Sequence, residues 1–167
     1  MKTDNHTIDE MAASDWAAVR EIYIQGITTG HATFNTTPPL WEQWDKSHLP
    51  ACRLVARADE RVVGWAALSP ISGMPAYAGV AEVSIYVAED QRSSGIGKAL
   101  LRGLVEASES AGIWTLEAKI LAENTASLAL HASCGFRTVG SRERVGQLNG
   151  VWRDAMLLER RSDSVGI

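Results

Sequence analysis

The residues best placed to do chemistry are two glycines set between two cations. The segment comprises Arg92, Ser93, Ser94, Gly95, Ile96, Gly97 and Lys98. Gly95 and Gly97 leave backbone N–H groups uncovered where a helix is expected to begin, at the positive end of its dipole. Arg92 and Lys98 add positive charge at the same place. The segment therefore predicts a site for a phosphate or pyrophosphate group.

Two common phosphate-binding motifs do not fit this segment. A Walker loop requires glycine at position 92 and Ser or Thr after Gly97-Lys98, whereas the chain has Arg92 and Ala99. A Rossmann fingerprint requires a third glycine at position 100, where the chain has Leu100. The pattern that remains is Arg-x-x-Gly-x-Gly.

A strand and a helix are expected to position this turn. Val83, Ile85 and Val87 alternate with polar or half-polar neighbours, which is the period of a strand, and apolar residues after Lys98 recur at helical spacing. The rest of the chain alternates strands with helices, which favours a mixed sheet flanked by helices. The other expected strands are 7–11, 52–58, 61–70, 115–120, 136–144 and 151–160, and the other helices are 14–29, 41–46 and 125–133.

A second motif follows the strand 115–120. Asn124 stands at the expected start of a helix, where its side chain can cap the backbone, and His131 lies seven residues later, before Gly135-Phe136. Together with Arg92-x-x-Gly95-x-Gly97, this resembles the two signatures of the GNAT superfamily of N-acetyltransferases. Many members carry Tyr at the position of His131.

The resemblance is closest to the phosphinothricin and methionine sulfoximine acetyltransferase branch. It rests on Gly30-His-Ala-Thr-Phe34, Glu82-Val-Ser-Ile-Tyr-Val87 and Val145-Gly-Gln-Leu-Asn-Gly-Val-Trp-Arg-Asp154, and it runs from about Ile8 to Glu159. One departure matters. Many branch members have His directly after the strand Glu, and this chain has Val83.

The resemblance implies an α/β (α+β) GNAT fold, with a mixed, mostly antiparallel central sheet that splays at the acetyl-CoA site. The length of 167 residues suits a single domain over residues 1–167, and a disordered tail is expected from about residue 162. Acetyl-CoA would be the co-substrate, with no metal. The backbone of Ile85, Tyr86 and Val87 would pair with the pantetheine arm, Ser93–Lys98 would hold the pyrophosphate, and Asn124 would contact the coenzyme A chain.

The resemblance also implies the catalytic groups. Glu82 precedes the splay and is the candidate general base, acting alone or through water because Val83 offers no relay; the alternative is a strand Glu that faces solvent. His131 occupies the position of the Tyr that protonates the leaving thiolate, or it is a helix histidine with a structural hydrogen bond. The expected acceptor pocket draws on Phe34, Met74, Pro75 and Tyr77 and on Glu82, Val83 and Ser84 of the strand.

Bulk properties exclude other classes of protein. The net charge of −4 argues against a nucleic-acid partner, and no apolar run approaches the length of a membrane span. The N-terminus lacks the apolar core of a signal peptide, and Cys52 and Cys134 have no metal-ligand spacing, which favours the cytoplasm. Branch members are commonly homodimers, so a homodimer is expected.

The resemblance implies acetyl transfer to the free α-amine of a small amino acid or analogue, of the phosphinothricin or methionine sulfoximine/sulfone type. Two alternatives stay open. The acceptor can be another amine, such as a polyamine, an aminoglycoside or a protein N-terminus, or the chain can be a coenzyme A-binding regulatory module without turnover. A small amino acid would need an enclosed pocket with a cation for its carboxylate.

Overall fold

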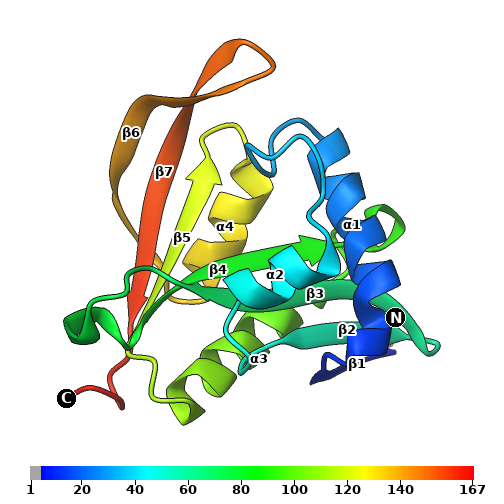
Figure 1. Ribbon diagram of the computed structural model, residues 1–167, viewed down its shortest axis with the longest axis horizontal. Helices are drawn as coiled ribbons and strands as arrows, with labels where there is room; N and C mark the ends of the chain where they lie inside the picture. The colour runs from blue at the N-terminus through cyan, green and yellow to red at the C-terminus, as the bar shows by residue number, and fades with distance from the viewer. Residues whose placement is uncertain (1–4) are drawn as a thin grey trace.

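The structure, a computed structural model that describes residues 5–167, is built around one seven-stranded sheet (Figure 1). The strands are β1 (His6–Glu10), β2 (Leu54–Ala58), β3 (Arg61–Pro70), β4 (Val80–Val87), β5 (Thr115–Leu121), β6 (Arg137–Leu148) and β7 (Val151–Arg161). They lie in the order β1-β2-β3-β4-β5-β7-β6, and β4 and β5 run parallel whereas the other neighbouring pairs are antiparallel. The mixed, mostly antiparallel sheet expected from the sequence is confirmed.

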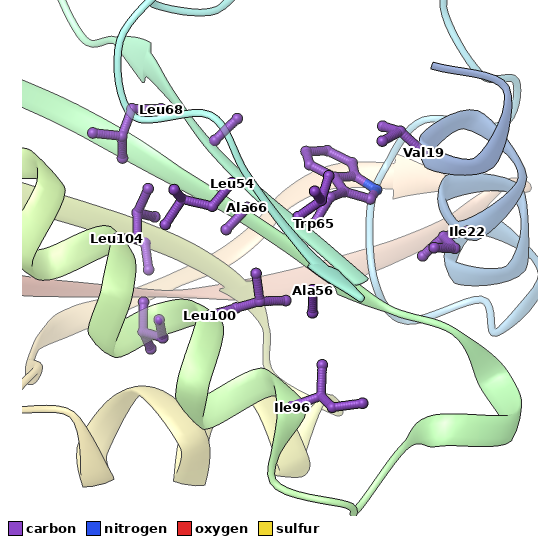
Figure 2. Close-up of a cluster of buried hydrophobic side chains, with 14 of the residues drawn as sticks. Val19, Ile22, Leu54, Ala56, Trp65, Ala66, Leu68, Ile96, Leu100 and Leu104 are labelled. Atoms are coloured by element: carbon purple, nitrogen blue, oxygen red, sulfur yellow. The ribbon is translucent and has the colours of Figure 1, made fainter. Parts of the chain in front are cut away.

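Helices cover both faces of the sheet. They are α1 (Trp16–Thr28), α2 (Trp41–Ser47), α3 (Ile96–Ser110) and α4 (Thr125–Ser133). Figure 2 shows Leu100 and Leu104 of α3 against one face of β2 and β3, while Val19 of α1 lies on the opposite side beyond Trp65. All four of these side chains are buried. The side chains of β3 therefore alternate between two apolar layers, one on each face of the sheet. Because both faces are buried, the register of the sheet is fixed.

The parallel pair β4–β5 separates after three residues. Val80, Ala81 and Glu82 pair with Thr115, Leu116 and Glu117, and no later residue of β4 pairs with β5. From residue 83 to residue 87, β4 keeps its partner β3 but has no strand on the other side. The two strands diverge in Figure 1, with β5 rising away from β4. The expected splay is confirmed, and it leaves one edge of β4 open to a ligand.

A partly buried ion pair ties β2 to the start of α1. Arg57 donates to both carboxylate oxygens of Asp15, at 3.0 and 2.8 Å, and the N–H of Ala12 donates to the same carboxylate at 2.9 Å. Burial alone would raise the pKa of Asp15, but the hydrogen bonds from Arg57 and Ala12 and the charge of Arg57 lower it overall. The ionised carboxylate is therefore part of the native structure.

This lowered pKa gives stability a defined pH dependence. Because the folded pKa of Asp15 lies below the unfolded value of about 3.9, its contribution is complete above that value and is lost as the pH falls through the folded pKa. We expect Asp15→Asn to lower the free energy of unfolding by about 2 kcal/mol at pH 7, and the difference from the wild type to vanish in strong acid. Urea titrations at a series of pH values measure both. A difference that is constant with pH would contradict the assignment.

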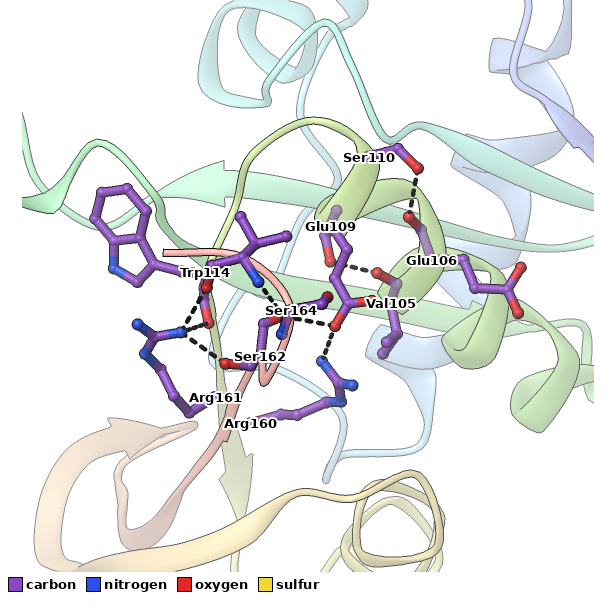
Figure 3. Close-up of polar contacts among 11 residues, drawn as sticks. Val105, Glu106, Glu109, Ser110, Trp114, Arg160, Arg161, Ser162 and Ser164 are labelled. Atoms are coloured by element: carbon purple, nitrogen blue, oxygen red, sulfur yellow. Dashed lines mark hydrogen bonds and ion pairs between the residues drawn. The ribbon is translucent and has the colours of Figure 1, made fainter. Parts of the chain in front are cut away.

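The last residues of the chain make polar contacts with α3 and with one another. The Ser162 hydroxyl donates to Glu109 of α3 at 2.8 Å, and Arg160 donates to the same carboxylate at 3.0 Å (Figure 3). Arg161 donates to the carbonyls of Val165 and Gly166. A polar composition suggested a free tail, but here the polar groups find partners on α3 and on the tail itself.

Candidate functional site

A cleft of about 740 Å³ opens where β4 and β5 diverge. Its walls come from the open stretch of β4, from β5 and α4, from the segment between α1 and α2, and from β6 and β7. The lining includes Tyr23, Thr33, Phe34, Gln43, Trp44, His48, Trp65, Glu82, Val83, Ser84, Ile85, Tyr86, Lys119, Asn124, His131, Arg142, Val145 and Gly146. The splay of the sheet therefore creates the cavity, and elements from both ends of the chain close it.

The structure brings eight of the predicted site residues together in the cleft. Glu82, Val83, Ser84, Ile85, Tyr86, Phe34, Asn124 and His131 all line the cleft. Three predicted acceptor contacts do not. Met74, Pro75 and Tyr77 lie in the exposed segment before β4, with Met74 60% and Tyr77 48% exposed, and they are absent from the lining. The connection before β4 enters the strand at its paired end, so these residues stay on the far side of the splay.

The glycine turn lies beyond the cleft, at the start of α3. Gly95 is in the left-handed region at φ 88° and α3 begins at Ile96. A Cβ at Gly97 would lie 3.3 Å from Leu130 of α4 and 3.7 Å from Val87, so the first turn of α3 sits against both elements. The turn thus continues the line of the open β4 edge. Together they fit a pantetheine arm along β4 and a pyrophosphate at the α3 N-terminus.

Gly95→Ala tests this turn. An L-residue in the left-handed region costs about 1–2 kcal/mol, and an added Cβ at Gly95 meets no atom within 4 Å, so strain and not collision is the expected effect. We expect a lower melting temperature and an acetyl-CoA Kd raised by about ten-fold, because the strained turn no longer holds its N–H groups in place. Calorimetry measures both quantities. Gly140→Ala, which also meets no atom, is the matched control. Equal Kd values in the two variants would contradict a role for the turn.

Glu82 is the only carboxylate among the described residues that line the cleft. It is the last residue of β4 that pairs with β5. One of its carboxylate oxygens lies 2.9 Å from the ammonium of Lys119 on β5. The Glu82 side chain is 31% exposed and that of Lys119 is 42% exposed. The carboxylate is therefore held at the point where the strands part, and it is accessible from the cleft.

His131 is almost completely buried, at 2% exposure. Its Nδ1 lies 2.8 Å from the Ser127 carbonyl one turn earlier, and its ring meets Phe136 edge-on at 5.0 Å. A carbonyl can only accept, so Nδ1 carries the proton and Nε2 is the acceptor. Burial lowers the pKa of His131, and the bond to Ser127 only partly offsets this. At neutral pH the imidazole is uncharged and has no Nε2 proton to give a leaving thiolate.

One wall of the cleft is aromatic. Trp65 stacks on Tyr86 across β3 and β4 with ring centroids 5.0 Å apart, and Tyr23 of α1 meets Tyr86 edge-on at 4.8 Å. Burial, and then the neighbouring Tyr23, raise the pKa of Tyr86 far above its ordinary range. The phenol stays protonated at neutral pH. Tyr86 can therefore donate a hydrogen bond in the cleft but cannot serve as the base.

A bulge in β6 shapes the opposite wall. The pairing of β6 with β7 shifts between Arg142 and Gly146, and the Asp154 carboxylate accepts the N–H of Arg144 at 2.7 Å within this bulge. The ring of Phe34 lies so close to Gly146 that a Cβ there would be 3.0 Å from it. Asp154 thus holds the backbone that supports Phe34 and places Arg142 at the cleft.

Two cations of the cleft, Lys119 and Arg142, were not predicted from the sequence. Lys119 carries no distinguishing signal, because Glu117 is an equally charged residue of the strand 115–120 and does not line the cleft. Arg142 has none, since its position depends on the bulge of β6. His48, which also lines the cleft, was missed because it follows α2 without any motif. Its Nδ1 lies 2.8 Å from the Trp44 carbonyl, and burial lowers its pKa.

Two further observations concern other kinds of site. Among residues 5–167, no group of three or more His, Cys, Asp and Glu side chains is arranged to hold a metal ion. Within the same part of the chain, every helix is too short or too polar to cross a membrane.

Comparisons with known proteins agree with this geometry. The acetyltransferase (GNAT) family matches residues 16–136. The phosphinothricin N-acetyltransferase of Alcaligenes faecalis is 33% identical over 92% of this chain and 81% of its own. The L-methionine sulfoximine/L-methionine sulfone acetyltransferase of Pseudomonas aeruginosa is 28% identical over 94% of this chain and 95% of its own. A phosphinothricin acetyltransferase from Sinorhizobium meliloti, solved with acetyl-CoA, is 29% identical with a TM-score of 0.86, covering 97% of this chain and 91% of its own.

The chain therefore belongs to the GNAT family of N-acetyltransferases. Within that family it falls in the phosphinothricin-like branch, as its motifs indicated.

Proposed function

We propose that this chain is an acetyl-CoA-dependent N-acetyltransferase that acts on the free α-amine of a small amino acid or analogue, of the phosphinothricin or methionine sulfoximine/sulfone type. The observation that carries the proposal is the placement of Glu82. It is the sole carboxylate among the described residues that line the cleft, beside a strand edge that is open to a thioester arm. The names of the relatives point to the same class of acceptor.

The residues of the cleft divide the chemistry between them. Glu82 accepts one proton from the acceptor ammonium, directly or through water, so that the nitrogen has a free electron pair. That nitrogen forms the C–N bond to the acetyl carbonyl as the C–S bond breaks, and its second proton leaves with the thiol or to solvent. Backbone N–H groups near Ile85 and Tyr86 on the open edge stabilise the developing oxyanion. His131 does not act as the acid for the thiolate, because its proton is on Nδ1 and is donated to the Ser127 carbonyl.

The test is release of coenzyme A thiol with a panel of acceptors. The panel contains phosphinothricin, methionine sulfoximine, methionine sulfone, ordinary amino acids, a polyamine and an aminoglycoside. Saturable turnover with one of the first three supports the proposal. Turnover only with the polyamine or the aminoglycoside would mean that the acceptor is an amine of that kind and not a small amino acid. Tight acetyl-CoA binding without turnover on any acceptor would favour a regulatory module.

We also propose that the protein acts in the cytoplasm as a homodimer. Cys52 and Cys134 are both free thiols, as a reducing compartment would keep them. The β6–β7 hairpin exposes Val139, Val145, Val151 and Trp152, the last at 56%. Exposed apolar residues gathered on one hairpin are typical of a surface covered by a partner. Light scattering of the purified protein tests the dimer, and a monomeric mass at micromolar concentration would overturn it.

A further inference from the structure

The charged groups of the cleft carry an inference about which part of the acceptor is recognised, and it rests on the proposed function. Only three of the described lining residues are ordinarily charged: Glu82, Lys119 and Arg142. The first two already form an ion pair, with 2.9 Å between the carboxylate oxygen and the ammonium. The cleft therefore presents one negative and one positive group in contact, and a second positive group apart from them.

We propose that the Glu82–Lys119 pair is the docking site for the zwitterionic head of a free α-amino acid. The α-ammonium of the acceptor takes the place of the Lys119 ammonium at Glu82. The α-carboxylate takes the place of the Glu82 carboxylate at Lys119. Lys119 is then the residue that makes the enzyme specific for acceptors with a free α-carboxylate.

The geometry of an amino acid explains why Lys119, and not Arg142, reads the carboxylate. The ammonium and carboxylate of an α-amino acid are attached to the same carbon, so their counter-ions must also be neighbours. Lys119 on β5 touches Glu82, whereas Arg142 is on β6, and β7 lies between β5 and β6 in the sheet. Arg142 is instead placed for a group at the far end of the acceptor side chain.

Charge balance adds to the argument. An amino acid that replaces the internal ion pair leaves every charge with a partner. An amine without a carboxylate would engage Glu82 and leave the Lys119 ammonium in the cleft without one, which is unfavourable for a partly desolvated charge. Residues 71–79, which precede β4, contain no Lys or Arg that could bind the carboxylate instead.

The test compares two acceptors that differ only in the carboxylate. L-methionine sulfone and its decarboxylated analogue, 3-(methylsulfonyl)propylamine, are assayed with the wild type, Lys119→Gln and Lys119→Arg. We expect Lys119→Gln to raise KM for the amino acid about ten-fold and to lower KM for the amine, because the amine then leaves no unpaired ammonium in the cleft. Lys119→Arg should restore most of the affinity for the amino acid. Arg102→Gln, which removes an exposed cation of α3 outside the cleft, is the control.

Other outcomes would overturn the inference. Equal losses for both acceptors, with a shifted pH profile of kcat, would mean that Lys119 acts only by holding Glu82. No change for either acceptor would remove Lys119 from recognition.

Calorimetric binding of methionine sulfone in the presence of coenzyme A separates this inference from the proposed function. Binding that depends on Lys119 without turnover would refute the function but support the docking site. Turnover that is unchanged in Lys119→Gln would support the function but refute the docking site. Absence of both binding and turnover in the wild type would refute the function and the docking site.

Discussion

Glu82→Gln is expected to lower kcat by at least about ten-fold while the acetyl-CoA Kd stays within about two-fold. The amide keeps the size of the side chain but cannot accept the proton of the acceptor ammonium. Glu82 lies at the end of the β4–β5 pairing, whereas the α3 turn that would hold the pyrophosphate lies past the other end of β4. The chemical step and coenzyme binding should therefore separate in this variant.

Glu117→Gln is the matched control for this substitution. Glu117 is the β5 partner of Glu82 in the sheet, yet it does not line the cleft. Removing its charge changes the local electrostatics by a similar amount without touching the acceptor site. A loss of turnover confined to Glu82→Gln would support the base, and equal losses in both variants would indicate a general effect of charge.

If Glu82 is not the general base, the other candidates in the cleft are Tyr86, His48 and His131. Tyr86 has a raised pKa and cannot be the base, but His48 and His131 are neutral imidazoles with lowered pKa values. Unchanged turnover in Glu82→Gln would move the base role to one of these histidines. The pH profile would then report it, because activity would fall as the pH drops below the pKa of that imidazole.

The strands and helices were predictable because the local signals agreed with one another. The alternation in 81–87, the two glycines after it and the apolar helical spacing from Ala99 onward all describe the same strand–turn–helix unit, and the structure places β4 and α3 there. Asn124 likewise does what its position indicated, since its side chain accepts the N–H of Ser127 at 3.2 Å. The contact of the tail with Glu109 has no local signal, because Glu109 is distant in sequence from Ser162.

The candidate site was predictable only where a motif marked it. Glu82, Asn124 and His131 belong to motifs and line the cleft. Lys119 and Arg142 belong to none, and they enter the cleft because of strand order and a bulge, which no local pattern encodes. Met74, Pro75 and Tyr77 were assigned by resemblance to a segment whose path in this chain leads away from the cleft.

Gly79→Ala is expected to cause the largest loss of stability, about 3 kcal/mol. A Cβ at Gly79 would lie 2.0 to 2.3 Å from atoms of the Trp114 indole, which is a rigid ring and cannot step aside like the end of a flexible chain. The Gly79 carbonyl also accepts the N–H groups of Trp114 at 2.8 Å and of Thr115 at 3.0 Å. The added methyl group would push apart two segments that these bonds hold together.

The position of Gly79 extends the effect from stability to the site. The β4–β5 pairing begins at the very next residue, where Val80 pairs with Thr115, and it lasts only as far as Glu82. Loosening this short junction should widen the splay, so Gly79→Ala should lose acceptor affinity as well as thermal stability. Gly73→Ala, where a Cβ meets no atom within 4 Å, should lose neither. Melting temperature and KM measured on both variants check this, and a stable Gly79→Ala enzyme would show that the indole has room to move. The β4–β5 junction is expected both to anchor the sheet and to set the width of the cleft. A loss of stability with unchanged KM would therefore mean that the width of the cleft is set by its outer walls, through Phe34 and the β6 bulge.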